Sequence, residues 1–265
     1  MKCLIIDKVY VGIAEELGKY MEVKTADNLP SSKDQVLAEI GDVDVLIMRV
    51  DPKIDKDIID AAKNLKIIGV CSVGLNHIDM DYAKEKGIQI FNAPGLNANA
   101  VAELTISKML DISRGTMTAN TDVKVKHEWD KYKFVGRELR GKTLGVMGFG
   151  RIGRRVGELG RAFGMTVVAY DPFLKAEDFE KEHATGMSID ELLKVADFVS
   201  IHVPLTPETK DLFNAKSIAE MKDDAVVLNM SRGGIVNEKD MYEALKAGKI
   251  GGYATDVMEN ELAGS

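Results

Sequence analysis

The chain has 265 residues, of which 45% are hydrophobic and 29% are charged, and its formal net charge is −7. This length fits one large domain or two ordinary ones, and the acidic balance argues against a nucleic-acid partner, which would require clustered Lys and Arg. No apolar run reaches the length of a membrane span and no signal peptide is evident, so we expect no membrane partner.

In the first part of the chain, short apolar runs alternate with helical patterns, an order typical of βαβ units and a mostly parallel sheet. Ser32 and Gln35 form a capping-box pattern that predicts the start of a helix, and Gly87 predicts the end of another. The expected strands are Cys3–Ile6, Val45–Arg49, Lys66–Cys71 and Ile88–Phe91.

A second alternating series follows in the later part of the chain. Ser188 and Glu191 form another capping-box pattern, and Gly248 ends the expected helix Glu238–Ala247. The expected strands of this series are Thr143–Met147, Thr166–Tyr170, Phe198–His202, Ala225–Asn229 and Gly251–Asp256.

Between the two series lies Asn97–Arg114, a long helical pattern that contains neither Gly nor Pro. It is followed by the polar stretch Thr116–Arg140, which holds the only tryptophan, Trp129. We therefore expect two α/β domains, residues 1–96 and 97–265, with the helix 97–114 as their link.

A glycine-rich loop, Gly148-Phe149-Gly150-Arg151-Ile152-Gly153, separates an apolar strand from the helical run Arg154–Phe163. The pattern G-x-G-x-x-G is weak alone but specific between a strand and a helix. Gly148 permits a tight turn, Gly150 lets a pyrophosphate approach the backbone, and Gly153 lets helix and strand pack closely. The helix N-terminus offers free N–H groups and a positive dipole end to the phosphates.

Asp171 ends the next strand, about twenty residues after the loop, where a carboxylate accepts hydrogen bonds from the adenosine ribose. A carboxylate there repels a 2′-phosphate, so the sequence predicts NAD rather than NADP as cofactor. The alternative is that Asp171 merely opens a turn at Pro172.

Several stretches of the chain resemble the NAD-dependent D-2-hydroxyacid dehydrogenases, and the phosphoglycerate dehydrogenases look most similar. These stretches are Gly69–Asp81, Asn92–Glu103, Gly141–Pro172, Ser200–Thr209, Asn229–Glu238 and, more weakly, Thr255–Glu261. They follow the family's order over nearly the whole chain. The resemblance implies an α/β fold with a flavodoxin-like substrate domain, then a Rossmann domain with a doubly wound parallel sheet, and an active site in the cleft between them.

The resemblance also implies which residues surround the cofactor, and it implies no metal site. Asp256 is similar to the family's aspartate that contacts the nicotinamide carboxamide. Beyond the loop and Asp171, the implied contacts are Pro172, His202, Val203, Pro204, Thr209, Asn229, Met230, Ser231 and Asp256.

Hydride transfer to a 2-oxo acid requires an anchor for the substrate carboxylate and a group that polarises its carbonyl. Arg232 is the first candidate because it follows the strand Ala225–Asn229, and ligands of open α/β sheets bind at the carboxyl ends of strands. A guanidinium matches a carboxylate bidentately, although an Arg in a loop is often merely solvated. The resemblance makes Arg232 the family's catalytic arginine.

Glu261 falls where the family has its catalytic glutamate, whose implied role is to hydrogen-bond a histidine and favour its protonated form. The alternative is a charged chain end. The family's acid/base histidine lies in a Pro-His-x-Gly motif further downstream, and none of the four histidines, His77, His127, His183 and His202, matches it. The family's C-terminal helix, which closes its first domain, is missing too. We therefore expect a truncated chain, with a shortened member of impaired catalysis as the alternative.

On the substrate side, Ser72-Val73-Gly74 resembles the family loop whose backbone N–H groups hold the substrate carboxylate, and an ordinary strand-end turn is the alternative. Arg49 matches a family arginine near the substrate, and Asn97 is a further candidate for the cleft. Asp51 follows where many relatives have a hydroxyl residue, and its charge would disfavour a phosphate nearby.

The leading hypothesis is an oxidoreductase that transfers a hydride between NAD(H) and a small 2-oxo or D-2-hydroxy acid, with 3-phosphoglycerate as one candidate. The alternative is a non-catalytic, NAD-sensing regulatory protein similar to a corepressor. The resemblance implies a homodimer formed through the NAD domain, with the polar stretch around Trp129 similar to the family's dimer arm. Two cysteines, Cys3 and Cys71, cannot make a disulfide framework, which favours a cytoplasmic setting.

Overall fold

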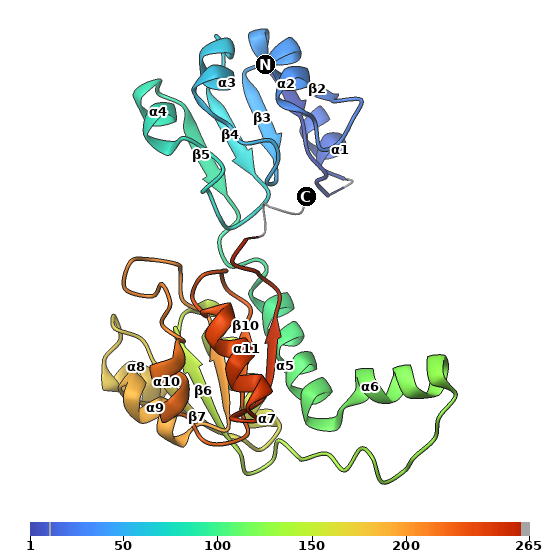
Figure 1. The fold of residues 1–265 in the computed structure, drawn as a ribbon. Coiled ribbons are helices and arrows are strands. Elements are labelled where there is room, and N and C mark those ends of the chain that lie inside the picture. The colour runs from blue at the N-terminus through green and yellow to red at the C-terminus, as the bar shows by residue number, and fades with distance from the viewer. Residues whose placement is uncertain (11, 261–265) are drawn as a thin grey trace. The chain divides into compact units, whose positions relative to one another are not determined.

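The computed structural model describes residues 1–10 and 12–260 (Figure 1). The chain divides into two compact units, of which the first spans Met1–Asn97 and the second begins at Ala98. Each unit is an α/β fold with its own parallel sheet. Within the described residues, no helix combines the length and the hydropathy that crossing a membrane requires.

The first unit contains a five-stranded sheet in the order β2-β1-β3-β4-β5, with all neighbours parallel. Its strands are β1 (Lys2–Ile5), β2 (Glu22–Thr25), β3 (Val45–Met48), β4 (Ile67–Val70) and β5 (Gln89–Asn92). This is the strand order of the flavodoxin-like fold, which confirms the expected fold of the first part of the chain. The β2 strand was not among the expected strands.

The two faces of this sheet are covered unequally. One face packs against α2 (Lys33–Glu39), the short 3₁₀-helix η1 (Ile40–Asp42), α3 (Lys56–Ala61) and α4 (Met80–Glu85). The other face packs against α1 (Ile13–Gly18). On that second side, the β5 residue Phe91 is aligned with Gly69 and remains 58% exposed. The capping box of Ser32 and Gln35 at the start of α2 is confirmed.

The second unit contains a six-stranded parallel sheet in the order β11-β10-β9-β6-β7-β8. The strands are β6 (Thr143–Met147), β7 (Thr166–Tyr170), β8 (Thr185–Gly186), β9 (Phe198–Ile201), β10 (Ala225–Asn229) and β11 (Ile250–Thr255). Numbered within the unit, this order is the doubly wound order of dinucleotide-binding domains, so the predicted Rossmann domain is confirmed. The strand order reverses between β6 and β9, where such domains bind ligands at the carboxyl edge.

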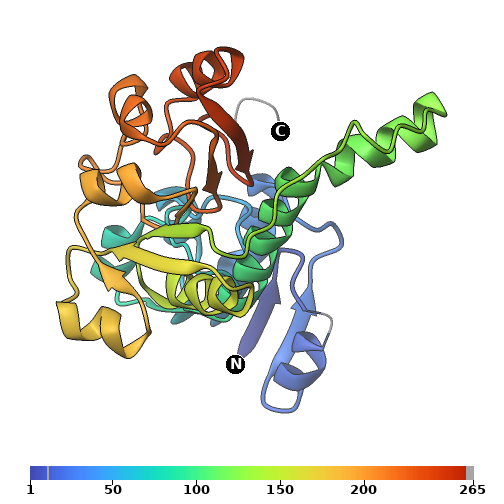
Figure 2. The same cartoon turned by 90° about the horizontal axis from the view of Figure 1, so that it is seen from below.

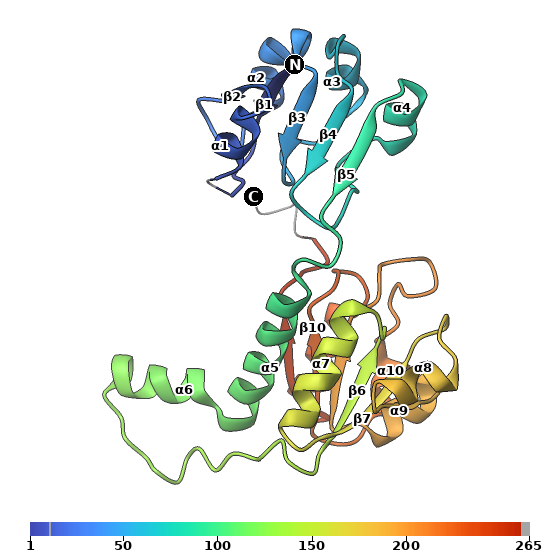
Figure 3. The ribbon, with the colours of Figure 1, turned by 180° about the vertical axis from the view of Figure 1, so that it is seen from behind.

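Helices cover both faces of the second sheet (Figures 1 and 3). The helices α5 (Ala98–Arg114), α7 (Arg151–Ala162) and α8 (Ala176–Lys181) share one hydrophobic core. The helices α9 (Ile189–Val195), α10 (Ala215–Glu220) and α11 (Glu238–Lys246) share the other. The capping box of Ser188 and Glu191 at α9 is confirmed.

A helical arm projects from this unit, as Figure 2 shows. It consists of α6 (Thr116–Thr121) and a π-helical turn, η2 (Asp122–Lys126), in a stretch where the sequence predicted no helix. The buried carboxylate of Asp122 binds Lys126 Nζ at 2.8 Å and Lys133 Nζ at 2.5 Å, which ties the outgoing and returning segments together.

Candidate functional site

The glycine-rich loop joins β6 to α7, and two of its glycines are sterically required. Gly148 has φ +84, and a Cβ there would lie 2.6 Å from the His202 carbonyl oxygen. A Cβ on Gly153 would lie 2.1 Å from the Gly148 carbonyl oxygen. Both positions therefore exclude any side chain, as the close packing of helix and strand in this motif requires.

Gly150 differs from the other two, because a Cβ there would meet nothing within 4 Å. It is the N-cap of α7, with φ −78 and ψ −155, and no side chain caps the helix. The first amide groups of α7 thus lack a side-chain cap at the positive end of a 12-residue helix, and Gly150 leaves the space beside it open. This cradle fits a pyrophosphate, which is the group that the loop pattern predicts.

Asp171 follows β7 and reaches back to the glycine-rich loop. Its Oδ2 accepts a hydrogen bond from the Phe149 N–H at 3.0 Å, and its Oδ1 accepts one from the Phe173 N–H at 3.0 Å. The acid therefore connects the carboxyl ends of β6 and β7 and does more than open a turn at the exposed Pro172. A carboxylate has lone pairs beyond these two bonds, so it can also accept bonds from ribose hydroxyls.

His202 supports the loop from the neighbouring strand β9. Its Nε2 lies 2.7 Å from the Ser200 hydroxyl, and its buried Nδ1 has no hydrogen-bond partner in the described part of the chain. Burial lowers the pKa of His202 to about 3, so the ring is neutral at physiological pH. Val203 is buried beside Gly148, whose Cβ would lie 2.9 Å from it.

The loop after His202 is shaped by its own side chains. The Thr209 hydroxyl lies 2.6 Å from the Pro204 carbonyl oxygen, to which it donates, and accepts a bond from the Thr206 N–H at 2.8 Å. Thr209 thus fixes the loop that carries the exposed Pro204. The predicted cofactor contacts of both residues stay predictions.

The loop after β10 presents Arg232 at the same carboxyl edge. The buried Asn229 donates from Nδ2 to the Arg232 carbonyl at 2.9 Å and accepts from the Ser231 hydroxyl at 2.8 Å. Arg232 is exposed, and its Nη1 donates to the Ser231 carbonyl at 2.7 Å, whereas Met230 is buried. The loop backbone is therefore fixed while the guanidinium stays accessible to a ligand.

The segment after β11 crosses this loop at close range. A Cβ on Gly233 would lie 1.9 Å from the Met258 carbonyl oxygen, so only glycine fits there. The Asp256 N–H donates to the Asn229 carbonyl at 3.2 Å, and the Glu259 N–H donates to Glu238 at 2.8 Å. These contacts hold the chain beside the Arg232 loop up to Glu259. Glu261, the predicted catalytic glutamate, lies outside the described residues.

The predicted substrate residues gather in the first unit around a hollow of about 530 Å³. Arg49, Ser72, Val73 and Asn97 all line it. The Ser72 hydroxyl lies 3.0 Å from the Arg49 carbonyl oxygen and 3.1 Å from that of Gly74, so it links the two loops although it donates to one at a time. The hollow is otherwise mostly apolar and extends onto the sheet face beside α1.

Asp7, which sequence reasoning did not single out, organises the loop that carries Arg49. Its carboxylate accepts backbone hydrogen bonds from Lys8 at 2.6 Å, Arg49 at 3.0 Å, Val50 at 2.6 Å and Asp51 at 3.0 Å. Burial raises the pKa of Asp7, but these four bonds outweigh it, and the pKa lies below its ordinary value. The one sequence signal was an acid directly after a buried strand.

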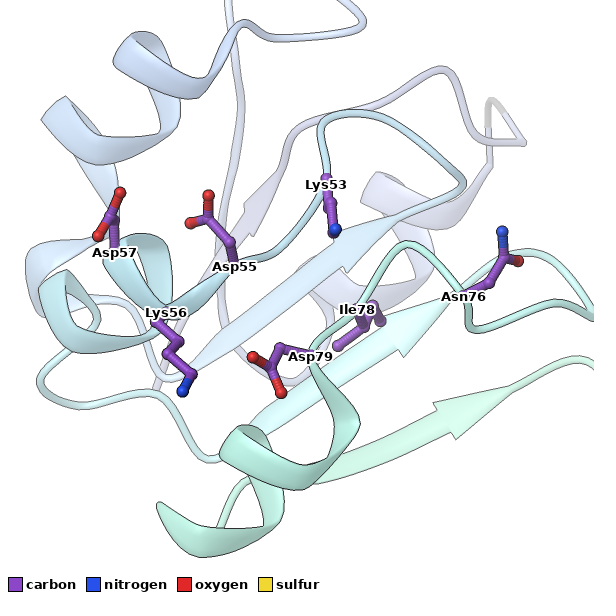
Figure 4. A pocket seen from close by; sticks show the side chains of 7 residues that line it. All are labelled: Lys53, Asp55, Lys56, Asp57, Asn76, Ile78 and Asp79. Atoms are coloured by element: carbon purple, nitrogen blue, oxygen red, sulfur yellow. The ribbon is translucent and has the colours of Figure 1, made fainter. Parts of the chain in front are cut away.

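A second hollow of the first unit, of about 410 Å³, lies between the loops that lead into α3 and α4 (Figure 4). Its acids already have partners, because Asp55 and Asp57 bind Lys33 Nζ at 2.6 and 2.5 Å and Asp79 caps α4. Within the described residues, no group of His, Cys, Asp and Glu side chains is arranged to hold a metal ion. We assign no site to this hollow.

The doubly wound sheet, the open N-terminus of α7 and the acid after β7 define a dinucleotide-binding protein of the Rossmann class. Residues 106–264 match the family described as "D-isomer specific 2-hydroxyacid dehydrogenase, NAD binding domain". The chain belongs to this family, which confirms the resemblance and NAD as the cofactor.

Relatives over nearly the whole chain support this assignment. The chain is 43% identical to a D-3-phosphoglycerate dehydrogenase of Methanocaldococcus jannaschii over 98% of this chain and 49% of the relative. It is 44% identical to a hydroxypyruvate reductase of Thermotoga maritima over 86% of this chain and 74% of the relative. The structure of a D-lactate dehydrogenase of Aquifex aeolicus, complexed with NAD and lactic acid, matches with a TM-score of 0.83 and 33% identity, over 98% of this chain and 78% of that one. The chain thus spans about half the length of the phosphoglycerate dehydrogenase.

Proposed function

We propose that the complete protein is an NAD-dependent oxidoreductase that interconverts a small D-2-hydroxy acid and its 2-oxo acid. The observation that carries this proposal is the uncapped N-terminus of α7 beside Asp171, at the sheet edge where Arg232 is presented. The relatives reported above are named as dehydrogenases and a reductase, and no observation favours the NAD-sensing alternative.

Each candidate residue has a role that its chemistry supports. Gly148, Gly150 and Gly153, with Arg151 and Ile152, would hold the pyrophosphate, and Asp171 the adenosine ribose. The exposed guanidinium of Arg232 would bind the substrate carboxylate bidentately and polarise the C2 carbonyl. NAD, when bound, accepts or donates the hydride at C2. The hydroxyl proton requires an acid/base group, for which the family's histidine and Glu261 are the proposed pair.

The first unit would bind the substrate through its hollow, with the backbone of Ser72–Gly74, Arg49 and Asn97 as contacts. The substrate is a 2-oxo or 2-hydroxy acid, and 3-phosphoglycerate is one candidate, in line with the names of relatives. Asp51, whose N–H is bound by Asp7, adds a negative charge two residues from Arg49 and disfavours a phosphate there.

The test of the cofactor site uses Gly150→Ser. A serine fits the N-cap backbone conformation and caps the first amides of α7, so the melting temperature is expected to stay the same or to rise. The same side chain fills the space of the pyrophosphate, so calorimetry should show NADH affinity reduced by at least about tenfold. Gly153→Ala is the contrasting variant, because its clash with Gly148 should lower both stability and affinity. Full NADH affinity in Gly150→Ser would contradict the proposed site.

The test of the reaction uses Arg232→Ala in the complete protein. Loss of the carboxylate anchor should reduce kcat/KM by about a thousandfold or more, while NADH affinity stays within about twofold. The measurement is NADH consumption, followed by absorbance, with a panel of 2-oxo acids. Unchanged kcat/KM for every acid that the wild type reduces would refute the role of Arg232.

The proposed assembly is a homodimer formed through the second unit and its arm. The arm and the segment that returns from it expose several large apolar side chains, with Val125 71%, Trp129 83% and Val135 84% exposed. Analytical ultracentrifugation should show a dimer that the double change Val125→Ser and Trp129→Ser converts to monomer. Tyr20→Ser, at an equally exposed aromatic residue of the first unit, is the control that should leave the dimer intact. We also propose a cytoplasmic location, in line with two free cysteines, Cys3 and Cys71.

A further inference from the structure

We propose that Arg154 is a positioning residue for the cofactor, which closes a ring of contacts around the glycine-rich loop and holds Asp171 in place. The inference rests on the proposed NAD site. It concerns the two peptide groups on either side of the Phe149 Cα, and the two loops that follow β6 and β7.

The Phe149 backbone is held from both sides. Its N–H donates to Asp171 Oδ2 at 3.0 Å, and its carbonyl oxygen accepts a bond from Arg154 Nε at 3.1 Å. The guanidinium of Arg154 is held in turn, because Nη1 donates to Glu182 Oε1 at 3.2 Å. Arg154 therefore spans from the loop to the residue that follows α8.

The chain itself closes this ring of contacts, since Asp171 and Glu182 lie at the two ends of the segment that contains α8. A second contact holds this segment against the loop. The buried ring of Phe149 stacks on Phe179 of α8, with centroids 5.6 Å apart and an interplanar angle of 29°. Gly186 permits this packing, because a Cβ there would lie 2.5 Å from the Phe179 ring.

The ring of contacts around the glycine-rich loop orients the ribose site but contributes little to the stability of the fold. The side chains of Arg154 and Glu182 are 38% and 37% exposed, and ion pairs of that exposure contribute little to folding. Without Arg154, however, the Phe149 carbonyl loses its donor, and the backbone of Phe149, whose N–H orients Asp171, is held at one fewer point. The orientation of Asp171 toward the ribose hydroxyls would then no longer be fixed before binding.

The loss of Arg154 is expected to affect the binding of two cofactors differently. NADH offers Asp171 both free hydroxyls of the adenosine ribose, whereas NADPH carries a 2′-phosphate that the carboxylate repels. A badly oriented Asp171 binds NADH less well and repels NADPH less well. The affinity ratio of NADH to NADPH should therefore fall, whereas a general loosening of the fold would weaken both cofactors alike.

The experiment is calorimetric titration of NADH and NADPH into this chain and its variants. Arg154→Ala and Glu182→Ala should each lower NADH affinity about fivefold to tenfold, lower the NADH to NADPH ratio by a similar factor, and leave the melting temperature nearly unchanged. Arg154→Lys keeps one donor and should restore part of the ratio. Arg155→Ala is the matched control, because Arg155 is 36% exposed and binds Asn99 and Glu158 instead.

Equal loss of both cofactors in Arg154→Ala and Glu182→Ala, or the same change of ratio in Arg155→Ala, would overturn the positioning role. If Arg154→Ala does not fold, Glu182→Met decides the matter, because it keeps the length of the side chain and removes both the charge and the acceptor that hold the guanidinium. An unchanged ratio in that variant would again overturn the role. A wild-type chain that binds neither cofactor would refute the proposed NAD site itself, so the two failures are distinguishable.

Discussion

His202 shows how burial alone determines the chemistry of one residue. Its Nδ1 is buried without a partner among the described residues, and burial lowers its pKa from 6.5 to about 3. The ring is therefore neutral near neutral pH. The backbone carbonyl oxygen of the same residue lies against Gly148, where a Cβ would lie 2.6 Å away.

The depressed pKa of His202 has a predictable effect on stability. Below pH 6.5 the His202 ring is protonated in the unfolded chain, whereas in the folded chain it stays neutral down to about pH 3. The free energy of unfolding therefore falls as the pH falls between these values. Replacing His202 by Gln removes this titration. Between pH 7 and pH 5, the free energy of unfolding of His202→Gln should therefore fall by about 2 kcal/mol less than that of the wild type.

The measurement is urea unfolding at a series of pH values for both proteins. His77, whose pKa burial also lowers, is present in both and cancels in the difference. Parallel pH profiles for the two proteins would show that the folded protein does not hold the His202 ring neutral.

The residues of the dinucleotide loop could be predicted from sequence, whereas Asp7 could not. The requirement at Gly153 is local, because a Cβ there meets the Gly148 carbonyl of the same strand–loop–helix motif. Gly148 meets the distant His202 carbonyl, but its positive φ is a local requirement of the tight turn. Asp7 acts on backbone groups more than forty residues away, at Arg49, Val50 and Asp51. No local pattern encodes such a contact, because it arises only when β1 and β3 become neighbours in the sheet.

At the level of elements, buried strands were the easiest to predict and exposed ones the hardest. The strands β6, β7 and β10 begin and end at the expected residues, because they are nearly continuous apolar runs. The edge strand β2 has the sequence Glu22-Val23-Lys24-Thr25 and is largely exposed, so it lacks that signal. The helix α7 begins at Arg151 and not at Arg154, because the glycine-rich loop itself forms the first turn.

The arm was missed for a related reason. Its helix α6 has no buried residue and η2 buries only Asp122, so their sequence shows no apolar face of helical period. A polar contact ties its two segments together, namely the pairing of Asp122 with two lysines. Such a contact joins residues 122 and 133 and becomes visible only in three dimensions.

At the level of the whole molecule, the division into two units predicts a localised response to cofactor. NADH at a hundred times its dissociation constant stabilises the bound state by about 2.7 kcal/mol. Hydrogen exchange should slow at Gly148–Gly153 and in β6 and β7, and should stay unchanged within the first sheet, whose strands pack in the cores of the first unit. Slower exchange in β3 or β4 on addition of NADH alone would mean that the two units respond together.

The unequal covering of the first sheet has a practical consequence. Phe91 and Leu96 are 58% and 84% exposed beside the largely apolar hollow that Ile13 and Ile47 also line. A fluorescent dye that binds exposed hydrophobic surface should therefore bind at this hollow of the native protein, while every strand of the sheet remains paired. With this protein, a bright dye signal in native buffer would therefore be no sign of a partly melted sample, and circular dichroism is the safer monitor of folding.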